Sequence, residues 1–321
     1  MNILYVFPGQ GSQYEGMGRD LCEAHAIARD VYDRANDVLG YDIKDMSFNN
    51  PGDELNLTRN TQPALLTHHI ACLEVFRDQT GGTVQPTMAA GHSLGEYSAL
   101  VAAKAMSFET ALRLVQTRGA LMGEHGQGEM TAFMLALDDI KPLAEKFNCA
   151  ISACNQPKQT VVGGSSADLE KLEAQVAEVF PRGRAIRLKT EGAFHTFYMD
   201  KAAELFKEAL AEAEMQVPEI RVLSNYTGGF HGDDIDEIRE RLYFQLKHPV
   251  MWDANLMAAL GEGVARIYEF GGGIGPGEAT EKRPNLEGMI KKASRAAGSE
   301  AEYTAAINRQ TIDEAASGES A

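Results

Sequence analysis

The feature that most constrains this chain is a short apolar run, residues 87–90, that ends in the motif Gly91-His92-Ser93-Leu94-Gly95. An Ala-rich segment, residues 98–103, follows, so the pattern predicts a buried strand, a sharp turn and a helix. Such a turn exposes its central residue, which makes Ser93 the candidate nucleophile and the N–H of Leu94 a candidate oxyanion donor. Without the flanking strand and helix, the same motif would be equally compatible with an ordinary turn.

Composition excludes several classes of function. The chain has 321 residues, 44% apolar and 24% charged, which is typical of a soluble globular protein that buries a full core. A net charge of -16 argues against general nucleic-acid binding, which needs a basic surface. Residues 1–7 are predicted as a strand and not a signal peptide, and no apolar run is long enough to cross a membrane. The cysteines show no CxxC spacing, which favours reduced thiols and a cytoplasmic location.

A glycine-rich turn, Pro8-Gly9-Gln10-Gly11-Ser12-Gln13, follows the first predicted strand. A nucleotide site is not expected there, because Tyr14 stands where a dinucleotide fingerprint has its third glycine. The N–H of Gln10 can act as a second oxyanion donor beside Leu94, although an ordinary strand-to-helix turn explains the glycines equally well. No His-Glu-x-x-His or other ligand cluster occurs in the sequence, so no metal site is expected.

A positive charge on an apolar helical face is the next informative feature. The helix predicted over residues 108–122 places Arg118 on the same face as Val115 and Met122. A guanidinium in that position must find an anion, because leaving it buried and unpaired is costly. Arg118 therefore either forms a structural ion pair or reaches water, or it binds a substrate carboxylate through its planar fork.

A serine nucleophile needs a base, and His195 is the candidate. It precedes a predicted helix over 197–214 at the junction between two predicted subdomains, and His248 is the second choice. The ring of His92 should point away from the hydroxyl of Ser93, its neighbour in the turn. Three further histidines lie in polar segments that we expect to be exposed, namely His25, His125 and His231. A purely structural histidine remains the alternative for His195.

Secondary-structure patterns predict an α/β fold in three parts. Residues 124–191 follow the order strand, helix, strand, strand, helix, strand, which predicts a ferredoxin-like small subdomain. It is inserted into a large α/β-hydrolase-like domain formed by residues 1–123 and 192–295. The Ala-, Ser- and Glu-rich residues 296–321 predict a flexible tail. Asn155, between the central strands of the small subdomain, is either a turn former or a side chain that faces the cleft.

A set of motifs occurs in a characteristic order, namely Pro8-Gly9-Gln10-Gly11-Ser12-Gln13, Thr61-Gln62-Pro63-Ala64, Gly91-His92-Ser93-Leu94-Gly95-Glu96, Arg118-Gly119 with Met122, Ala193-Phe194-His195, and Gln245 before His248-Pro249-Val250. Together they resemble the malonyl-CoA:acyl carrier protein transacylases and the acyltransferases of polyketide synthases. The resemblance covers about residues 1–270, and the ordered set is far more specific than any single motif.

The resemblance implies transfer of a malonyl group from coenzyme A to the phosphopantetheine thiol of an acyl carrier protein, in fatty acid or polyketide biosynthesis. It implies that Ser93 is acylated, and that His195 is the base, oriented by the backbone carbonyl of Gln245. The N–H groups of Gln10 and Leu94 would form the oxyanion hole. Substrate-binding residues are implied as well: Arg118 for the malonyl carboxylate, with Gln62, Asn155, Phe194 and His92 around the pocket. The implied chemistry needs no bound cofactor or metal, and the composition already argued against nucleic-acid and membrane partners.

One segment departs from the family pattern. The family has a compact Gly-Pro-Gly-Lys segment near its end, whereas this chain has an extended run from Phe270 to Glu278 followed by Glu281-Lys282-Arg283-Pro284. The departure concerns the wall near the pocket entrance. Within the pocket, the phenylalanine of Ala193-Phe194-His195 resembles the one found in malonyl-selective members of the family. Its ring would crowd the α-methyl branch of a methylmalonyl group.

Two other functions compete with transfer. An acyl-carrier-protein thioester hydrolase would use the same Ser-His pair. Hydrolases that resemble this family generally lack an arginine at the position of Arg118, so Arg118 favours transfer. A non-catalytic docking module is the third possibility. An acidic carrier protein needs a basic patch on this acidic chain, and the candidates are Arg182, Arg184, Arg187 and Lys189. A charged strand edge that opposes aggregation explains these four residues equally well.

Overall fold

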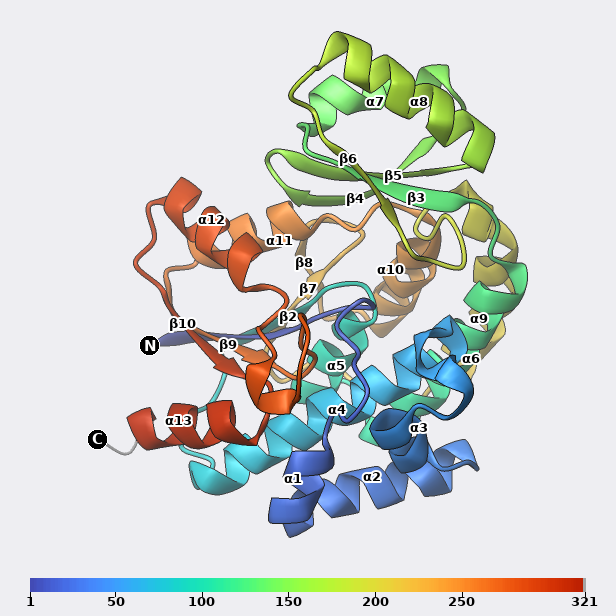
Figure 1. Ribbon diagram of the computed structural model, residues 1–321. Coiled ribbons are helices and arrows are strands. Elements are labelled where there is room, and N and C mark those ends of the chain that lie inside the picture. The colour runs from blue at the N-terminus through green and yellow to red at the C-terminus, as the bar shows by residue number, and fades with distance from the viewer. Residues whose placement is uncertain (320–321) are drawn as a thin grey trace.

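The computed structural model describes residues 1–319 and contains two separate sheets (Figure 1). The larger sheet has the strand order β10-β9-β1-β2-β7-β8. Its strands are β1 (Asn2–Phe7), β2 (Met88–Gly91), β7 (Arg221–Ser224), β8 (Gly229–Phe230), β9 (Val264–Phe270) and β10 (Glu302–Ala306). All neighbours pair in parallel except β8, which is antiparallel to β7. The apolar runs of β1 and β2 fit this arrangement, because a parallel sheet is buried on both faces.

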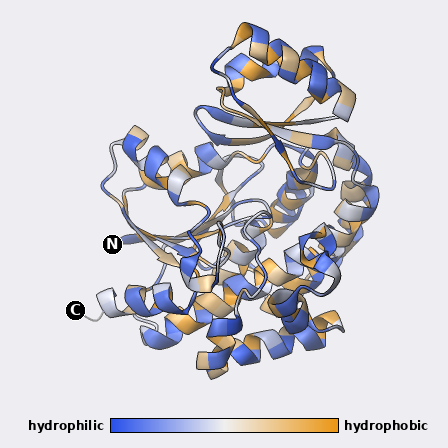
Figure 2. Ribbon diagram, in the orientation of Figure 1, coloured by the Kyte–Doolittle hydropathy of each residue, from blue (hydrophilic) through white to orange (hydrophobic). Residues whose placement is uncertain are grey.

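Helices cover both faces of the larger sheet. They are α1 (Arg19–Ala24), α2 (Ala26–Leu39), α3 (Ile43–Asn49), α4 (Thr58–Gln79), α5 (Gly95–Ala102), α6 (Phe108–His125), α9 (Asp200–Glu212), α10 (Ile235–Lys247), α11 (Trp252–Gly261), α12 (Glu287–Ala297) and α13 (Arg309–Glu319), with 3-10 helices at Pro51–Asn56, Phe197–Met199 and Ala279–Glu281. Figure 1 shows α4 and α5 on one side of the sheet and α11 and α12 on the other. Apolar and polar residues alternate along most helices, as expected when one face of each is buried (Figure 2).

The smaller sheet forms a separate layer with its own two helices. Its elements are β3 (Glu129–Phe133), α7 (Leu137–Lys146), β4 (Ala150–Gln156), β5 (Gln159–Gly164), α8 (Ser166–Val179) and β6 (Ala185–Leu188). The strands pair antiparallel in the order β4-β5-β3-β6, and the helices pack on one face around a small core. This is the ferredoxin-like order, so the predicted fold class, an α/β domain with an inserted small subdomain, is confirmed.

Backbone hydrogen bonds attach the small subdomain to the large domain. The N–H of Cys154 donates to the carbonyl of Val250 over 2.8 Å, and the N–H of Val250 donates to the carbonyl of Ser152 over 2.9 Å. These bonds place β4 beside the segment that follows α10. The cleft between the two sheets is therefore built from residues far apart in the sequence.

The flexible tail expected over residues 296–321 needs correction. Strand β10 extends the larger sheet beside β9, and α13 buries Ile312 against the large domain. The composition was misleading because small alanines allow α13 to approach α4 closely, and backbone pairing in β10 requires no large side chains. Only residues 320 and 321 of the expected tail lie outside the described part of the chain. Among the described residues, no helix combines the length and the apolar character that a membrane span requires.

Candidate active site

The turn between β2 and α5 holds Ser93 in a strained conformation. Its φ angle is 53°, in the left-handed region that non-glycine residues seldom adopt. The glycines on either side permit the turn: a Cβ on Gly91 would lie 1.8 Å from the carbonyl carbon of Gly95. A Cβ on Gly95 would lie 2.2 Å from the carbonyl oxygen of Phe7. The motif thus has the geometry of a nucleophile elbow, which presents the serine hydroxyl to the cleft.

The imidazole of His195 lies against this hydroxyl. Its Nε2 is 2.7 Å from Ser93 Oγ, and its Nδ1 is 2.6 Å from the backbone carbonyl oxygen of Gln245. A carbonyl oxygen can only accept a hydrogen bond, so Nδ1 carries the proton in the neutral ring. Nε2 is then free to accept the proton of the serine hydroxyl, as a general base must.

Burial keeps the ring of His195 neutral. Desolvation, with a further contribution from the positive charge of Arg118, lowers the pKa of His195 to about 3, although the Gln245 carbonyl opposes the shift. A base with so low a pKa is unprotonated throughout the physiological range.

We expect the rate of Ser93 acylation to show no acidic limb with a midpoint near the ordinary histidine value. The limb due to His195 should appear only as the pH approaches about 3, and Arg118→Ala should move it upward because a nearby positive charge is lost. Single-turnover acylation between about pH 5 and pH 8 measures this. In the unfolded chain the ring of His195 takes up a proton below about pH 6.5, whereas in the folded protein it does so only near pH 3. The free energy of unfolding should therefore decrease as the pH falls from about 6.5 to about 3. A wild-type limb near 6.5 would contradict the assignment.

Arg118 is fully buried beside the nucleophile. Its NH1 donates to Gln62 Oε1 over 2.8 Å, and its NH2 donates to Gln245 Oε1 over 2.9 Å and to Ser93 Oγ over 3.2 Å. Its guanidinium carbon lies 5.6 Å from the ring centroid of Tyr97. Of the two structural alternatives, contact with water is excluded by burial, and its hydrogen-bond partners among the described residues are all neutral. The arrangement leaves a buried cation without a carboxylate partner, directed at the serine.

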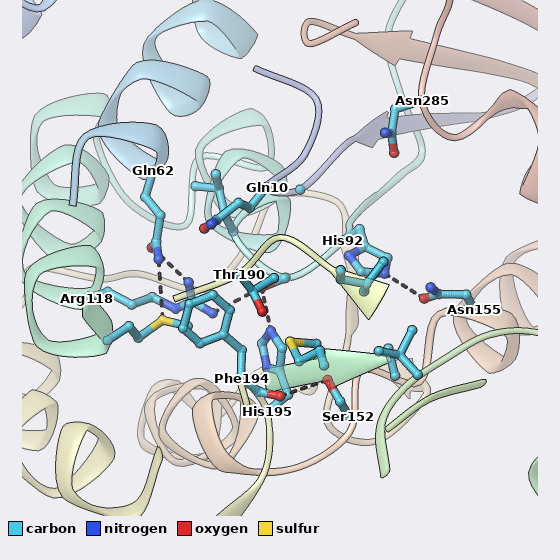
Figure 3. Close-up of a pocket in the computed structure, with 18 of the residues that line it drawn as sticks. Gln10, Gln62, His92, Arg118, Ser152, Asn155, Thr190, Phe194, His195 and Asn285 are labelled. Carbon is cyan, nitrogen blue, oxygen red and sulfur yellow. Dashed lines mark hydrogen bonds between the residues drawn. The ribbon is translucent and has the colours of Figure 1, made fainter. Parts of the chain in front are cut away.

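A cavity of about 200 Å³ brings the candidate residues together (Figure 3). Its polar lining includes Gln10, Gln62, His92, Ser93, Arg118, Asn155 and His195, together with Ser152 and Thr190. Phe194, Met122, Met130 and Leu188 supply apolar surface, while Asn285 and Met289 add a wall from the start of α12. A small polar centre within apolar walls suits one short acyl group with a charged end. Gln245 lies behind this lining and contacts the site through His195 and Arg118.

Gln10 and Leu94, the two predicted oxyanion donors, both line the cavity. Leu94 precedes α5 directly, and Gln10 lies in the cavity wall with its side chain bound to Thr58 Oγ1 over 3.1 Å. The N–H of Ser93 is unavailable, because it donates to Asn225 Oδ1 over 2.6 Å. This geometry is compatible with the predicted oxyanion hole, and the roles of Gln10 and Leu94 stay a prediction.

His92 and Asn155 form a pair across the cleft. His92 Nε2 lies 2.8 Å from Asn155 Oδ1, and burial lowers the pKa of His92, so the neutral ring donates to the amide oxygen. Strand β4 continues through Gln156, so Asn155 is a strand residue whose side chain reaches the cleft and not a turn former. The ring of His92 is directed away from the serine hydroxyl, as expected.

The other histidines differ from expectation: His25 and His125 were expected to be exposed but are half-buried. His248, the second choice as base, packs against the rings of Tyr226 and Phe244, away from Ser93. His231 was expected to be exposed, yet it is buried and lies 2.8 Å from the carboxylate of Glu96. The short polar segment around His231 suggested exposure, but a backbone hydrogen bond from the N–H of His231 to the carbonyl of Val222, over 2.8 Å, holds it against the larger sheet.

Comparison with known proteins identifies the family. Residues 4–259 match the family model described as the acyl transferase domain. The chain belongs to this family. A "Malonyl CoA-acyl carrier protein transacylase" of Bacillus subtilis is 36% identical over 302 residues, covering 91% of this chain and 90% of the relative. A "Polyketide biosynthesis malonyl CoA-acyl carrier protein transacylase" of the same organism is 36% identical over 303 residues, covering 91% and 97%.

Solved structures agree with this acyl transferase assignment. A malonyl-transacylase in complex with a type II PKS acyl-carrier protein has a TM-score of 0.88 and 31% identity, covering 99% of this chain and 100% of that one. An acyl-carrier-protein-S-malonyltransferase from Bartonella henselae has the same TM-score with 29% identity, and both chains are covered completely (100% each).

The structure adds two residues to the acyl transferase site that the sequence analysis did not single out, Asn225 and Glu96. Asn225 holds the elbow, since its side chain accepts from Ser93 N and donates to the carbonyl of Gly91 over 2.7 Å. Glu96 lies beneath the nucleophile, fully buried in the first turn of α5. Its signal was present in the sequence, because a charge inside an Ala-rich buried helix poses the same problem as Arg118. Asn225 had no comparable signal.

Proposed function

We propose that this acyltransferase moves a malonyl group from coenzyme A to the phosphopantetheine thiol of an acyl carrier protein through a malonyl-Ser93 intermediate. One observation carries the proposal: a hydroxyl, an imidazole and a buried guanidinium with no carboxylate among its hydrogen-bond partners in residues 1–319 meet in one cavity, with Ser93 Oγ 2.7 Å from His195 Nε2 and 3.2 Å from Arg118 NH2. The names of the relatives and the relative solved with its carrier protein support the same reaction.

The first half-reaction acylates the serine. Ser93 Oγ attacks the thioester carbonyl while His195 Nε2 takes the hydroxyl proton, and the N–H groups of Gln10 and Leu94 stabilise the tetrahedral oxyanion. As the C–S bond breaks, His195 returns the proton to the sulfur of coenzyme A. Each oxyanion donor contributes about 2.7–4 kcal/mol in comparable sites.

The second half-reaction runs these steps in reverse. His195 takes the proton of the carrier's thiol, the sulfur attacks the malonyl-serine ester, and Ser93 recovers its proton as the C–O bond breaks. The product of the first half must leave before the second thiol enters, which predicts ping-pong kinetics. The side chains and backbone N–H groups of the chain supply each step, so the proposed mechanism uses no resident cofactor. The free, buried cysteines are compatible with a proposed cytoplasmic location.

Transfer and hydrolysis are separated by one assay. Purified protein is mixed with radiolabelled malonyl-CoA and a phosphopantetheinylated carrier protein, and label is followed on the carrier and in free malonate. We expect faster accumulation on the carrier. Predominant release of malonate would instead favour the thioester hydrolase.

Of the four residues in the predicted basic patch, three are exposed without a carboxylate in any ion pair found among the described residues. Arg187 bonds the carboxylates of Glu129 and Glu173, so its charge is compensated, whereas Arg182, Arg184 and Lys189 are exposed. Lys189 is best placed for docking, because Leu188 and Thr190 on either side line the cavity.

Replacing Arg182, Arg184 and Lys189 together by Glu should raise KM for the carrier roughly three- to tenfold, since exposed charges contribute little individually. KM for malonyl-CoA should be unchanged. Steady-state kinetics with each substrate varied measures this, with Lys207→Glu on the exposed surface of α9 as the control. If the triple variant aggregates while its kinetics are unaltered, the residues protect the edge strand β6 instead.

A further inference from the structure

A carboxylate lies beneath the nucleophile and takes no direct part in the proposed chemistry. Glu96 is fully buried, and no lysine or arginine is among its hydrogen-bond partners in the described residues. Its Oε2 accepts from the backbone N–H of Asn225 and from Gln245 Nε2, both over 3.0 Å, and its Oε1 accepts from His231 Nε2 over 2.8 Å. Burying a carboxylate costs desolvation free energy, which its hydrogen-bond donors must offset. We therefore expect Glu96 to have a function in this place, and holding these donors in position is the one its contacts indicate.

The contact with Gln245 fixes the orientation of an amide. The Gln245 Nε2 group donates to Glu96 Oε2 and also to the backbone carbonyl of Ser93 over 2.8 Å. Both partners are pure acceptors, so the NH₂ end must face them and the amide oxygen must face the other way. That oxygen accepts from Arg118 NH2 over 2.9 Å. A flipped amide would direct its NH₂ group at the guanidinium and its oxygen at two acceptors.

Gln245 therefore contacts both the proposed general base, His195, and the proposed carboxylate-binding residue, Arg118. Its backbone carbonyl orients His195, and its side-chain amide orients Arg118. The backbone contact depends on the position of α10, whereas the amide contact depends on how the side chain is held. A loss at Glu96 should consequently affect the guanidinium more than the imidazole.

We infer that Glu96 is a positioning residue for the carboxylate clamp: by fixing the amide of Gln245, it holds Arg118 where the free acid end of the acyl group binds. The inference rests on the proposed function and deepens it, because it concerns selectivity at the same site. The charge of Glu96 has a second effect in the same direction. Burial lowers the pKa of Arg118, and Tyr97 and Glu96 oppose that shift, which favours the charged clamp.

The test compares Glu96→Ala with the conservative Glu96→Gln. Glutamine keeps an oxygen for Gln245 and Asn225, and its NH₂ end can face His231 once that ring carries its proton on Nδ1, which has no partner among the described residues. Glu96→Ala should lower kcat/KM for malonyl-CoA roughly 10- to 100-fold, as expected for a lost hydrogen-bond network around a charged group. Glu96→Gln should recover most of the loss.

A second readout separates positioning from a merely structural role. The rate at which an uncharged fluorophosphonate modifies Ser93 reports on the Ser-His pair without the clamp, and it should change less than about threefold in Glu96→Ala. In a Gln245→Ala background, where the backbone carbonyl remains, Glu96→Ala should cause no further loss of malonyl selectivity. The inference would be overturned if Glu96→Ala lowered kcat/KM for malonyl-CoA and the fluorophosphonate rate equally. It would also be overturned if the losses of malonyl selectivity in Glu96→Ala and Gln245→Ala were fully additive in the double variant.

Two controls keep the test decisive. If Glu96→Ala does not fold, Glu96→Asp replaces it, because the shorter side chain keeps the charge but withdraws the acceptor from Gln245; the same selective loss is expected. Wild-type protein that fails to transfer malonyl at all would refute the proposed function before any variant is compared. With wild-type transfer established, the variants judge Glu96 alone.

Discussion

Ser93→Ala protein should form no malonyl-enzyme and should lose transfer activity by roughly four to six orders of magnitude, as when a nucleophile is removed from a Ser-His pair. The reason is that the covalent route disappears entirely, while binding and the oxyanion donors remain. Intact-mass measurement after mixing with malonyl-CoA tests this directly. The wild type should gain the mass of one malonyl group, and peptide mapping should place it on Ser93.

A matched control is available inside the same cavity. Ser152 also lines the pocket, but its hydroxyl donates to the carbonyl of Phe194 over 2.7 Å and is not at the elbow. Ser152→Ala should retain the adduct. An adduct that persists in Ser93→Ala protein would show that another residue is the nucleophile.

Arg118→Ala should lower kcat/KM for malonyl-CoA roughly 30- to 1000-fold, because the malonyl carboxylate would enter the cavity unpaired. This corresponds to a loss of about 2–4 kcal/mol in transition-state stabilisation. Acetyl-CoA carries no such charge, so its use should be unchanged or improved. The ratio of the two kcat/KM values for Ser93 acylation measures the effect. Selectivity for malonyl should fall by most of that factor.

The controls for Arg118 come from the same helix and from charge chemistry. Arg113, exposed on α6, should be replaceable by alanine without a change in selectivity. Arg118→Lys keeps the charge but not the planar fork, so it should give an intermediate loss. Thermal unfolding of each variant excludes a folding defect as the cause. Unchanged selectivity in folded Arg118→Ala would remove Arg118 from its proposed role.

Sequence reasoning succeeded where the physical constraint is local. The Gly-x-Ser-x-Gly turn predicts most of its own geometry, because the clash that demands glycine at Gly91 is with Gly95 in the same motif. The clash at Gly95 involves Phe7 of the adjoining strand β1 and therefore depends on the sheet. The apolar face of α6 likewise indicated that Arg118 lies in a buried position, which the structure confirms. The tail was mistaken because pairing of β10 with β9 depends on backbone groups, which composition does not report.

The sequence by itself determined the nucleophile turn, the alternation of strands and helices, and the position of a charged residue on a buried helical face, since each follows from local sterics or from the periodicity of apolar residues. Sequence reasoning named His195 and the Gln245 carbonyl as candidates, but only the tertiary structure brought them to Ser93 and placed Glu96 beneath them. His195 is 102 residues from Ser93, and His231 is 135 residues from Glu96. Contacts over such separations depend on the order of strands in the sheets and on how the small subdomain is attached, and no local pattern encodes those distances.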